Sequence, residues 1–178
     1  KKILTFAKKK LVSIKKIDSF ISLTGYIKST DFDHINYKSF LNHINVNYYS
    51  NLIFIKHIYK KMIYNKWGRI LLSSSIGTSF GGGEKTFLYS LSKFNNEFIP
   101  KIFRNKYAKY ILYNVLKIGV TDTKIHFKIP NKNLKKRINL IPTKRMATTQ
   151  EVSNKIFSLA SEENTLIHGQ IINISGGE

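Results

Sequence analysis

The side chains with the clearest chemical potential lie between Ile70 and Lys93, in the stretch ILLSSSIGTSFGGGEKTFLYSLSK. Tyr89 and Lys93 are four residues apart, so a helix would place both side chains on one face, one turn apart. Because a nearby ammonium lowers the pKa of a phenol, the pair is typical of a proton donor. Three serines, Ser73 to Ser75, follow the apolar run 70–72, and a hydroxyl at the end of this strand could bind the substrate atom that receives the proton. The same residues also occur in ordinary helices and turns, so the stretch alone leaves a purely structural role open.

The composition indicates one globular domain over residues 1–178. The chain is 42% hydrophobic and 13% aromatic, which suits a buried core. No apolar run is long enough to span a bilayer, so we expect no membrane span. Cysteine is absent, which excludes disulfides and thiol metal sites and fits a cytoplasmic location. The five histidines have no metal-ligand spacing, so we expect no bound metal.

The net charge of +20, from 30 Lys+Arg against 10 Asp+Glu, raises the question of a polyanionic partner. Nucleic acid and an anionic membrane surface are the two candidates. The basic residues are spread along the whole chain rather than gathered in one stripe, so we do not expect nucleic-acid binding to be the main function. A general attraction for anionic ligands, including phosphorylated cofactors, is the favoured interpretation. The loop GTSFGGGEKT is not a P-loop, because Glu84 rather than glycine precedes Lys85.

Strand-like and helix-like patterns alternate along the chain. This alternation predicts an α/β fold with a parallel sheet and helices on both faces, in which ligands bind beyond the C-terminal ends of the strands. Ser75, Gly119 and Thr123 fall at such ends. We expect strands at 17–23, 69–73, 110–117 and 169–174, helices at 1–16, 39–64, 88–105 and 149–160, and irregular chain at 26–37, 120–132 and 133–147.

Two of the expected helices contain residues that disturb them. Asparagine is a poor residue inside a helix, so the helix over 39–64 is expected to bend near Asn45–Asn47. Pro100 should kink or break the helix over 88–105.

Further motifs accompany the Tyr–Lys pair, and their order is specific when taken together. Ser75 stands before Tyr89-Ser90-Leu91-Ser92-Lys93, with Ser74 as an alternative, and Asn47 lies in the preceding helix. The segment NVLKIGVTDT (114–123) follows, and the chain ends with a pattern that runs from Arg145-Met146 to Gly176-Gly177. Over about residues 17–178 the chain resembles the classical short-chain dehydrogenases/reductases, in the branch that includes 3-oxoacyl-carrier-protein reductases.

The resemblance implies a Rossmann-like sheet and an NAD(P)-dependent oxidoreductase that moves a hydride between a nicotinamide cofactor and a small carbonyl or alcohol substrate. Tyr89 would exchange a proton with the substrate oxygen, Lys93 would lower the tyrosine pKa and hold the cofactor ribose, and Ser75 would hydrogen-bond the substrate oxygen. Asn47 would support a water-linked proton path to Lys93. The residues that would bind the cofactor are Tyr89, Lys93, Gly119, Val120, Thr121 and Thr123.

The chain departs from the family pattern at three places. No glycine precedes Gly25, whereas the family begins with a strand, a glycine-rich turn and a helix that seat the cofactor pyrophosphate. Ser22-Leu23-Thr24-Gly25 stands where Asn-Asn-Ala-Gly is usual, and Ile118 stands where proline is usual. We therefore expect a fragment or short form that lacks the first strand–helix–strand units and binds NAD(P)H weakly or not at all. A truncated, catalytically inactive relative is the alternative function, and the choice between NAD and NADP stays open.

The family usually forms dimers or tetramers through its two long helices, which correspond here to about 39–64 and 88–105. The apolar residues expected at such an interface are Phe94, Phe98, Ile102, Ile55, Tyr59 and Met62. The alternative is that these side chains simply pack against the sheet.

Overall fold

In the computed structural model, which describes residues 5, 11, 13–129 and 133–178, four parallel strands form one sheet in the order β1-β2-β3-β4. Helical segments connect successive strands, so the predicted parallel α/β fold is confirmed. Ten residues of the helix expected for 1–16 lie outside the described residues, and its last four, 13–16, are not helical. The strands are β1 (Ser19–Ser22), β2 (Gly68–Ser75), β3 (Ile111–Ile118) and β4 (Ile171–Ile174).

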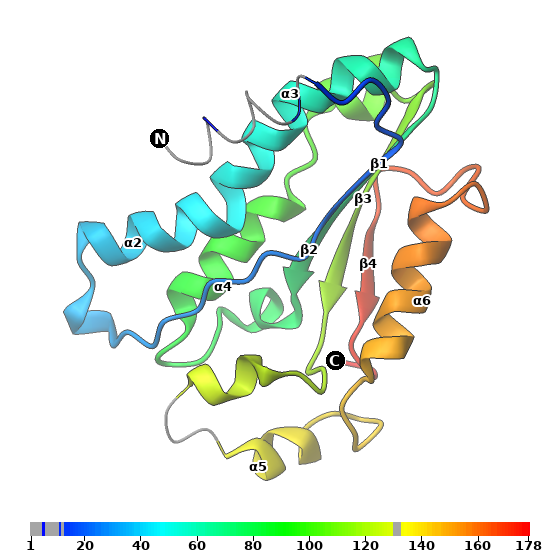
Figure 1. Cartoon of the computed structure of the whole chain (residues 1–178). Coiled ribbons are helices and arrows are strands. Elements are labelled where there is room, and N and C mark those ends of the chain that lie inside the picture. Colours follow the sequence, from blue (N-terminus) through cyan, green and yellow to red (C-terminus); the bar gives the residue numbers. More distant parts are fainter. Residues whose placement is uncertain (1–4, 6–10, 12, 130–132) are drawn as a thin grey trace.

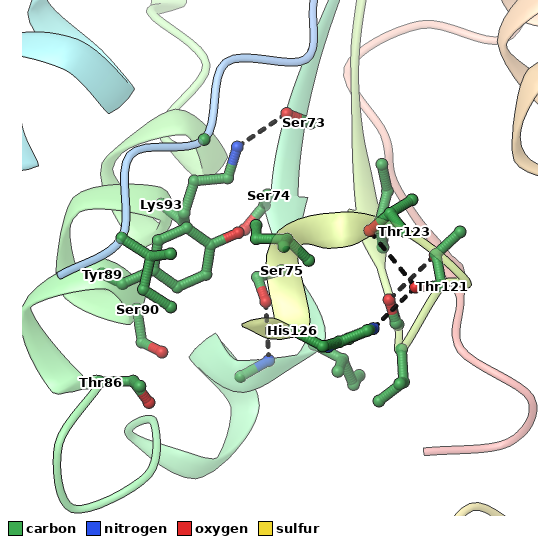
Figure 2. Close-up of a pocket in the computed structure, with 18 of the residues that line it drawn as sticks. Ser73, Ser74, Ser75, Thr86, Tyr89, Ser90, Lys93, Thr121, Thr123 and His126 are labelled. Carbon is green, nitrogen blue, oxygen red and sulfur yellow. Dashed lines mark hydrogen bonds between the residues drawn. The ribbon is translucent and has the colours of Figure 1, made fainter. Parts of the chain in front are cut away.

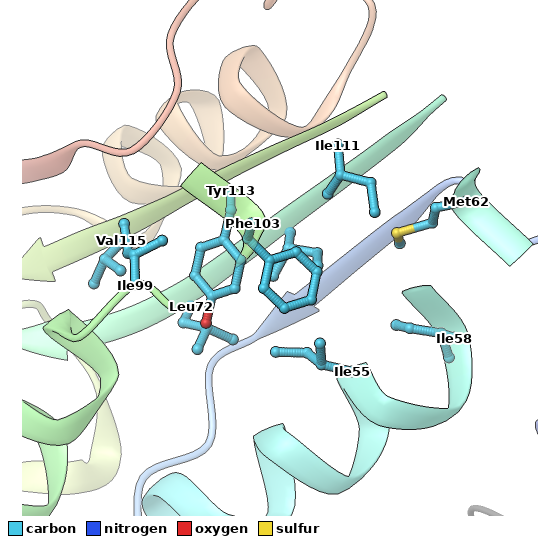
Figure 3. Close-up of a cluster of buried hydrophobic side chains, with 10 residues drawn as sticks. Ile55, Ile58, Met62, Leu72, Ile99, Phe103, Ile111, Tyr113 and Val115 are labelled. Atoms are coloured by element: carbon cyan, nitrogen blue, oxygen red, sulfur yellow. The ribbon is translucent and has the colours of Figure 1, made fainter. Parts of the chain in front are cut away.

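Helices cover both faces of the sheet (Figure 1). Helices α3 (Ser50–Tyr64) and α4 (Phe87–Phe94) lie on one side, and α6 (Thr149–Ala160) lies on the other. The larger apolar cluster fills the space between α3 and the sheet (Figure 3). Each aliphatic side chain that is fully buried there stabilises the fold by about 1.5–3 kcal/mol. Its buried members are Ile55, Ile58, Met62, Ile70, Leu72, Ile99, Phe103, Ile111, Tyr113 and Val115.

Strand β2 carries its three serines to different faces of the sheet. Leu72 belongs to the cluster under α3, whereas Leu71 packs with Leu159 of α6. Because side chains alternate along a strand, Ser73 and Ser75 share the α6 face with Leu71, and Ser74 shares the α3 face with Leu72.

The expected helix over 39–64 is a continuous path of three segments. Helix α2 (Tyr37–Ile44) begins with a capping box between Asn36 and Ser39 and leads into a π-helical turn at Asn45–Tyr49. Helix α3 follows directly. The π-helical turn lies where the asparagines predicted a bend, and π-turns inside helices are often found at functional sites.

The expected helix over 88–105 is wrong in its extent. Helix α4 ends at Phe94 and continues only as a short 3-10 turn at Asn95–Glu97. Phe98 is extended, and a separate π-helical turn follows at Ile102–Lys106. Pro100 explains the break, because proline has no N–H to donate and forces the residue before it out of the helical region.

The expectation that residues 133–147 are irregular is also wrong, since they include helix α5 (Leu134–Asn139). The Asn133 side chain accepts a hydrogen bond from the Lys136 N–H and so caps this helix. Short 3-10 helices lie in three segments that were expected to be loops. They are Phe32–His34, Ile76–Phe80 and Lys124–Lys128. In the described part of the chain, no helix is both long and apolar enough to cross a membrane.

Candidate active site

The C-terminal ends of the strands border a cavity of about 940 Å³ (Figure 2). Its walls come from the segments that follow β1, β2 and β3, from α4 and from the start of α6. Seven of the eight predicted site residues line it together, whereas Asn47 is buried behind it. The seven are Ser75, Tyr89, Lys93, Gly119, Val120, Thr121 and Thr123.

Lys93 is held in the cavity wall by neutral groups. Its Nζ donates to Ser73 Oγ at 2.7 Å and to the Thr24 carbonyl oxygen at 2.9 Å. Strand β1 ends at Ser22, opposite Leu72, so Ser73 has no β1 neighbour and the lysine reaches it past the end of β1. An ammonium has three N–H donors, so one is left to donate toward the cavity.

Burial also changes the charge of this lysine. Only 2% of Lys93 is exposed, and burial lowers its pKa from 10.5 to about 7. The charged and neutral forms are therefore both populated near neutral pH. Sequence reasoning missed Ser73, although the run of three serines at a predicted strand end was a usable signal.

Tyr89 keeps its proton at neutral pH. Burial raises the pKa of its hydroxyl, and a hydrogen bond from Ser75 lowers it by less. The net direction is opposite to the lowering expected from a neighbouring ammonium, because burial is the larger effect. A protonated phenol in the cavity wall is suited to donate a proton.

The structure distinguishes Ser75 from its neighbour Ser74. Ser75 Oγ accepts a hydrogen bond from the Gly77 N–H at 3.2 Å and caps the 3-10 helix Ile76–Phe80. Its own O–H therefore remains available to donate. The Ser74 hydroxyl instead donates to Glu97 at 2.6 Å, so Ser75 rather than Ser74 is the serine whose hydroxyl bonds Tyr89.

Asn47 lies in the π-helical turn with its side-chain donors already engaged. Its amide oxygen accepts from the Tyr26 N–H at 2.6 Å, and its amide nitrogen donates to the Tyr26 carbonyl and to Ser92 Oγ, each at 2.8 Å. Its main-chain carbonyl accepts from the side chains of Asn51 at 3.1 Å and Asn96 at 2.9 Å. Asn47 thus ties the segment after β1, which supplies the Thr24 carbonyl, to α4. The water-linked path from Asn47 to Lys93 stays a prediction.

Gly119 begins the segment that was expected to bind the cofactor. Its N–H donates to the Ile174 carbonyl at 2.7 Å, and a Cβ at this position would lie 2.7 Å from Ser175 Cα. Only glycine allows the ends of β3 and β4 to approach so closely. The following peptides, through Thr123, are thereby turned into the cavity wall.

Two cations at the cavity wall were missed by the sequence. Lys85 forms an exposed ion pair with Asp31 at 3.2 Å, and Arg137 of α5 pairs with Glu178. Arg137 reaches the cavity because α5 forms where irregular chain was expected. Among the described residues no cluster of His, Cys, Asp and Glu could hold a metal ion.

Comparison with known proteins places this site in a family context. The family model described as enoyl-(acyl carrier protein) reductase matches residues 1–178. A 3-oxoacyl-[acyl-carrier-protein] reductase FabG of Buchnera aphidicola subsp. Schizaphis graminum is 29% identical over 162 residues, which are 90% of this chain and 66% of that protein. The FabG of Rickettsia bellii is 25% identical over 169 residues, which are 94% of this chain and 69% of that protein.

Solved structures share the fold. ElxO with NADP bound has a TM-score of 0.83 at 23% identity, over 98% of this chain and 72% of its own. A 3-oxoacyl (acyl-carrier-protein) reductase of Agrobacterium tumefaciens with NADP bound has a TM-score of 0.83 at 18% identity, over 99% of this chain and 69% of its own. The chain thus spans about two thirds of the length of the first of these relatives. Because the family model matches residues 1–178, the chain belongs to the short-chain dehydrogenase/reductase family.

Proposed function

We propose that the protein is an NAD(P)-dependent oxidoreductase that reduces a carbonyl, with a 3-oxoacyl thioester as the substrate class and NADP(H) as the favoured cofactor. The observation that carries the proposal is the convergence of Ser75, Tyr89 and Lys93 in one cavity at the strand ends. The similarity to 3-oxoacyl-[acyl-carrier-protein] reductases supports the substrate class, and the similarity to structures with NADP bound supports the cofactor.

In the proposed reaction each of these side chains has a part in the proton transfer. The Tyr89 hydroxyl, protonated at neutral pH, donates its proton to the substrate oxygen as that oxygen gains charge. The free O–H of Ser75 donates to the same oxygen and fixes its position. Lys93 keeps one N–H directed into the cavity, fixed there by Ser73 and Thr24. When bound, the nicotinamide supplies the hydride.

The residues present fit one half of the cofactor. Lys93, Tyr89 and the segment Gly119–Thr123 would hold the nicotinamide and its ribose, because they offer donors and peptide groups along one wall of the cavity. A pyrophosphate is normally seated on a glycine-rich turn, and this chain has no glycine before Gly25. The alternative function is a relative that keeps the proton-transfer groups but does not bind the cofactor.

A fluorescence titration with NADPH separates the two functions. We expect the dissociation constant of NADPH for the 178-residue chain alone to lie above the micromolar range, because these residues include no glycine-rich turn for the pyrophosphate. The product of the whole reading frame, including any segment encoded before Lys1, should bind NADPH and oxidise it in the presence of acetoacetyl thioester. A micromolar dissociation constant for the 178-residue chain would show that the missing seat has been wrongly inferred. Failure of the whole product to bind NADPH would leave the inactive relative as the function.

We also propose that copies of the chain associate through α4 and the segment after it. Phe94 and Phe98 are 56% and 71% exposed and extend an apolar row with Leu91 and Ile102. Of the other residues expected at this interface, Ile55 and Met62 are buried in the core instead, as the alternative interpretation held.

Replacing both exposed phenylalanines, Phe94→Ser and Phe98→Ser, should shift the protein towards the monomer by removing the centre of this apolar row. Light scattering coupled to size-exclusion chromatography measures the mass. Phe157→Ser, an equally exposed phenylalanine on α6 across the sheet, provides the comparison. Dissociation by Phe157→Ser, with the α4 variant still associated, would place the interface on the other face.

A further inference from the structure

A buried carboxylate lies directly behind the candidate active site. Glu97, in the 3-10 turn that continues α4, has only 8% of its side chain exposed. Its Oε1 accepts a hydrogen bond from Ser74 Oγ at 2.6 Å and lies 2.6 Å from Thr78 Oγ1. Its Oε2 lies 3.1 Å from Nζ of Lys117, which is 13% exposed. No step of the proton transfer described above uses this carboxylate.

Two partners of Glu97 lie on either side of Ser75 in the sequence. Ser74 precedes it, and the Thr78 hydroxyl lies 2.8 Å from the Ser75 carbonyl oxygen as well as against Glu97, so its single proton is shared between two acceptors. Lys117 also reaches Ser79 Oγ at 3.4 Å. The residues before and after Ser75 are thus fastened to one carboxylate.

The position of Glu97 on its helix explains why it matters for Tyr89. Tyr89 and Lys93 lie one turn apart on α4, and Glu97 ends the 3-10 turn that continues this helix. One element therefore carries the proton donor, its lysine and the group that fastens the strand end bearing Ser75. A change in the path of β2 at its last residue would move the Ser75 hydroxyl away from that of Tyr89.

Stability alone is a poor explanation for this arrangement. Taking a carboxylate and an ammonium out of water costs several kcal/mol per ion, and apolar residues of the same size often serve equally well. A buried ion pair with directional hydrogen bonds does, however, define position more narrowly than apolar packing.

We propose that Glu97 is a positioning residue, which holds the segment from Ser74 to Thr78 against the end of α4 and so keeps the Ser75 hydroxyl beside Tyr89. The expected effect on turnover rests on the function proposed above, whereas the positioning role itself does not. The contact between Ser75 and Tyr89 can be tested without cofactor or substrate.

The test measures the pKa of a fluorinated tyrosine at position 89 by 19F NMR in the 178-residue chain. The 3-fluoro group lowers the phenol pKa into a range where the protein stays folded. Because the hydrogen bond from Ser75 lowers the pKa of Tyr89, Ser75→Ala should raise it by about one pH unit. Glu97→Gln should raise it by a similar amount, and adding Ser75→Ala to Glu97→Gln should change it no further.

Glu97→Gln leaves Lys117 buried without a counter-charge, which carries a risk of unfolding. A second variant avoids this risk. The pair Glu97→Gln with Lys117→Met removes both charges and should give the same pKa rise. Glu151→Gln is the matched control, because Glu151 also accepts from a threonine hydroxyl and pairs with a cation, Arg145, yet contacts none of the residues around Ser75. It should leave the pKa unchanged.

Turnover gives the second readout. In the whole product the double variant should lower kcat by about tenfold and leave the NADPH dissociation constant unchanged. If the fluorotyrosine in the folded double variant has the same pKa as in the wild type, the positioning role is wrong, whether or not the protein turns over substrate. Absence of turnover with the expected titration leaves the positioning role standing and rejects only the proposed reaction.

Discussion

Tyr89→Phe lowers kcat of the whole protein by about 10²–10⁴-fold, the usual contribution of a positioned acid or base, while NADPH binding stays within about twofold of its value. The substitution removes only the hydroxyl that donates the proton, and the ring continues to fill its place in the cavity wall. Ser75 and Lys93 are untouched, so substrate positioning should persist. The measurement is NADPH oxidation with an acetoacetyl thioester, alongside a fluorescence titration of the cofactor.

Tyr113→Phe is the matched control for this variant. Tyr113 is also a tyrosine of the folded interior, 2% exposed, but it belongs to the core under α3, packs 5.5 Å from Phe103 between ring centroids and does not line the cavity. Its loss of a hydroxyl should leave kcat close to that of the wild type. Turnover by Tyr89→Phe at the wild-type rate would reject the role proposed for Tyr89 and leave the cavity without a proton donor.

The sheet was predictable because its signals are local. The apolar run at 70–72 is bounded by glycine and serines, and the segment around Ile111 has the same character, so each indicates a buried strand wherever its neighbours lie. Since parallel strands end at one edge, the positions of Ser75, Gly119 and Thr123 at that edge followed from the strands alone. The Tyr–Lys spacing then needed only a helix to bring both side chains to that edge.

The helix ends were harder to predict because they depend on competition between signals. Phe94, Phe98 and Ile102 repeat at helical spacing across Pro100, yet the periodicity there belongs to two separate segments that expose these residues. Helix α5 was missed for the opposite reason, since a basic, weakly apolar stretch forms a helix once Asn133 caps it.

The polar contacts around the site were beyond sequence reasoning. Glu97 occupies a position that is unremarkable along the chain, and it acquires a role only when β2 and the end of α4 lie side by side. Ser73 belongs to a serine run that marks the strand end, but its contact with Lys93 depends on the same packing. Burial of Lys93 is of the same kind, because no local pattern shows that its ammonium will bond the neutral Ser73 hydroxyl and Thr24 carbonyl.

Lys93→Met should stabilise the folded chain at pH 7 by about 1–3 kcal/mol while abolishing turnover. The lysine pKa falls from 10.5 to about 7 on burial, and every tenfold change in the protonation equilibrium corresponds to about 1.4 kcal/mol of penalty for folding the charged form. The expected gain is smaller than the whole fall in pKa implies, because methionine leaves the Thr24 carbonyl and the Ser73 hydroxyl without their donor. Urea unfolding at a series of pH values measures the free energy.

The direction of the pH dependence distinguishes the burial of Lys93 from the general effect of removing one positive charge. Between pH 7 and 10.5 the unfolded lysine binds a proton that the folded one has lost, so the wild type gains stability as the pH rises through this window. The methionine that replaces the lysine has nothing to titrate, and the advantage of the variant should therefore be largest below pH 7 and disappear near pH 10.5. Lys60→Met, at an exposed position of α3, also removes one of the many positive charges, yet it should give only a small gain. A Lys93→Met chain that is less stable than the wild type at pH 6, or whose advantage does not shrink as the pH rises, would show that neutral partners hold the ammonium as well as water does. The lysine would then enter the reaction fully charged, while burial would still keep Tyr89 protonated.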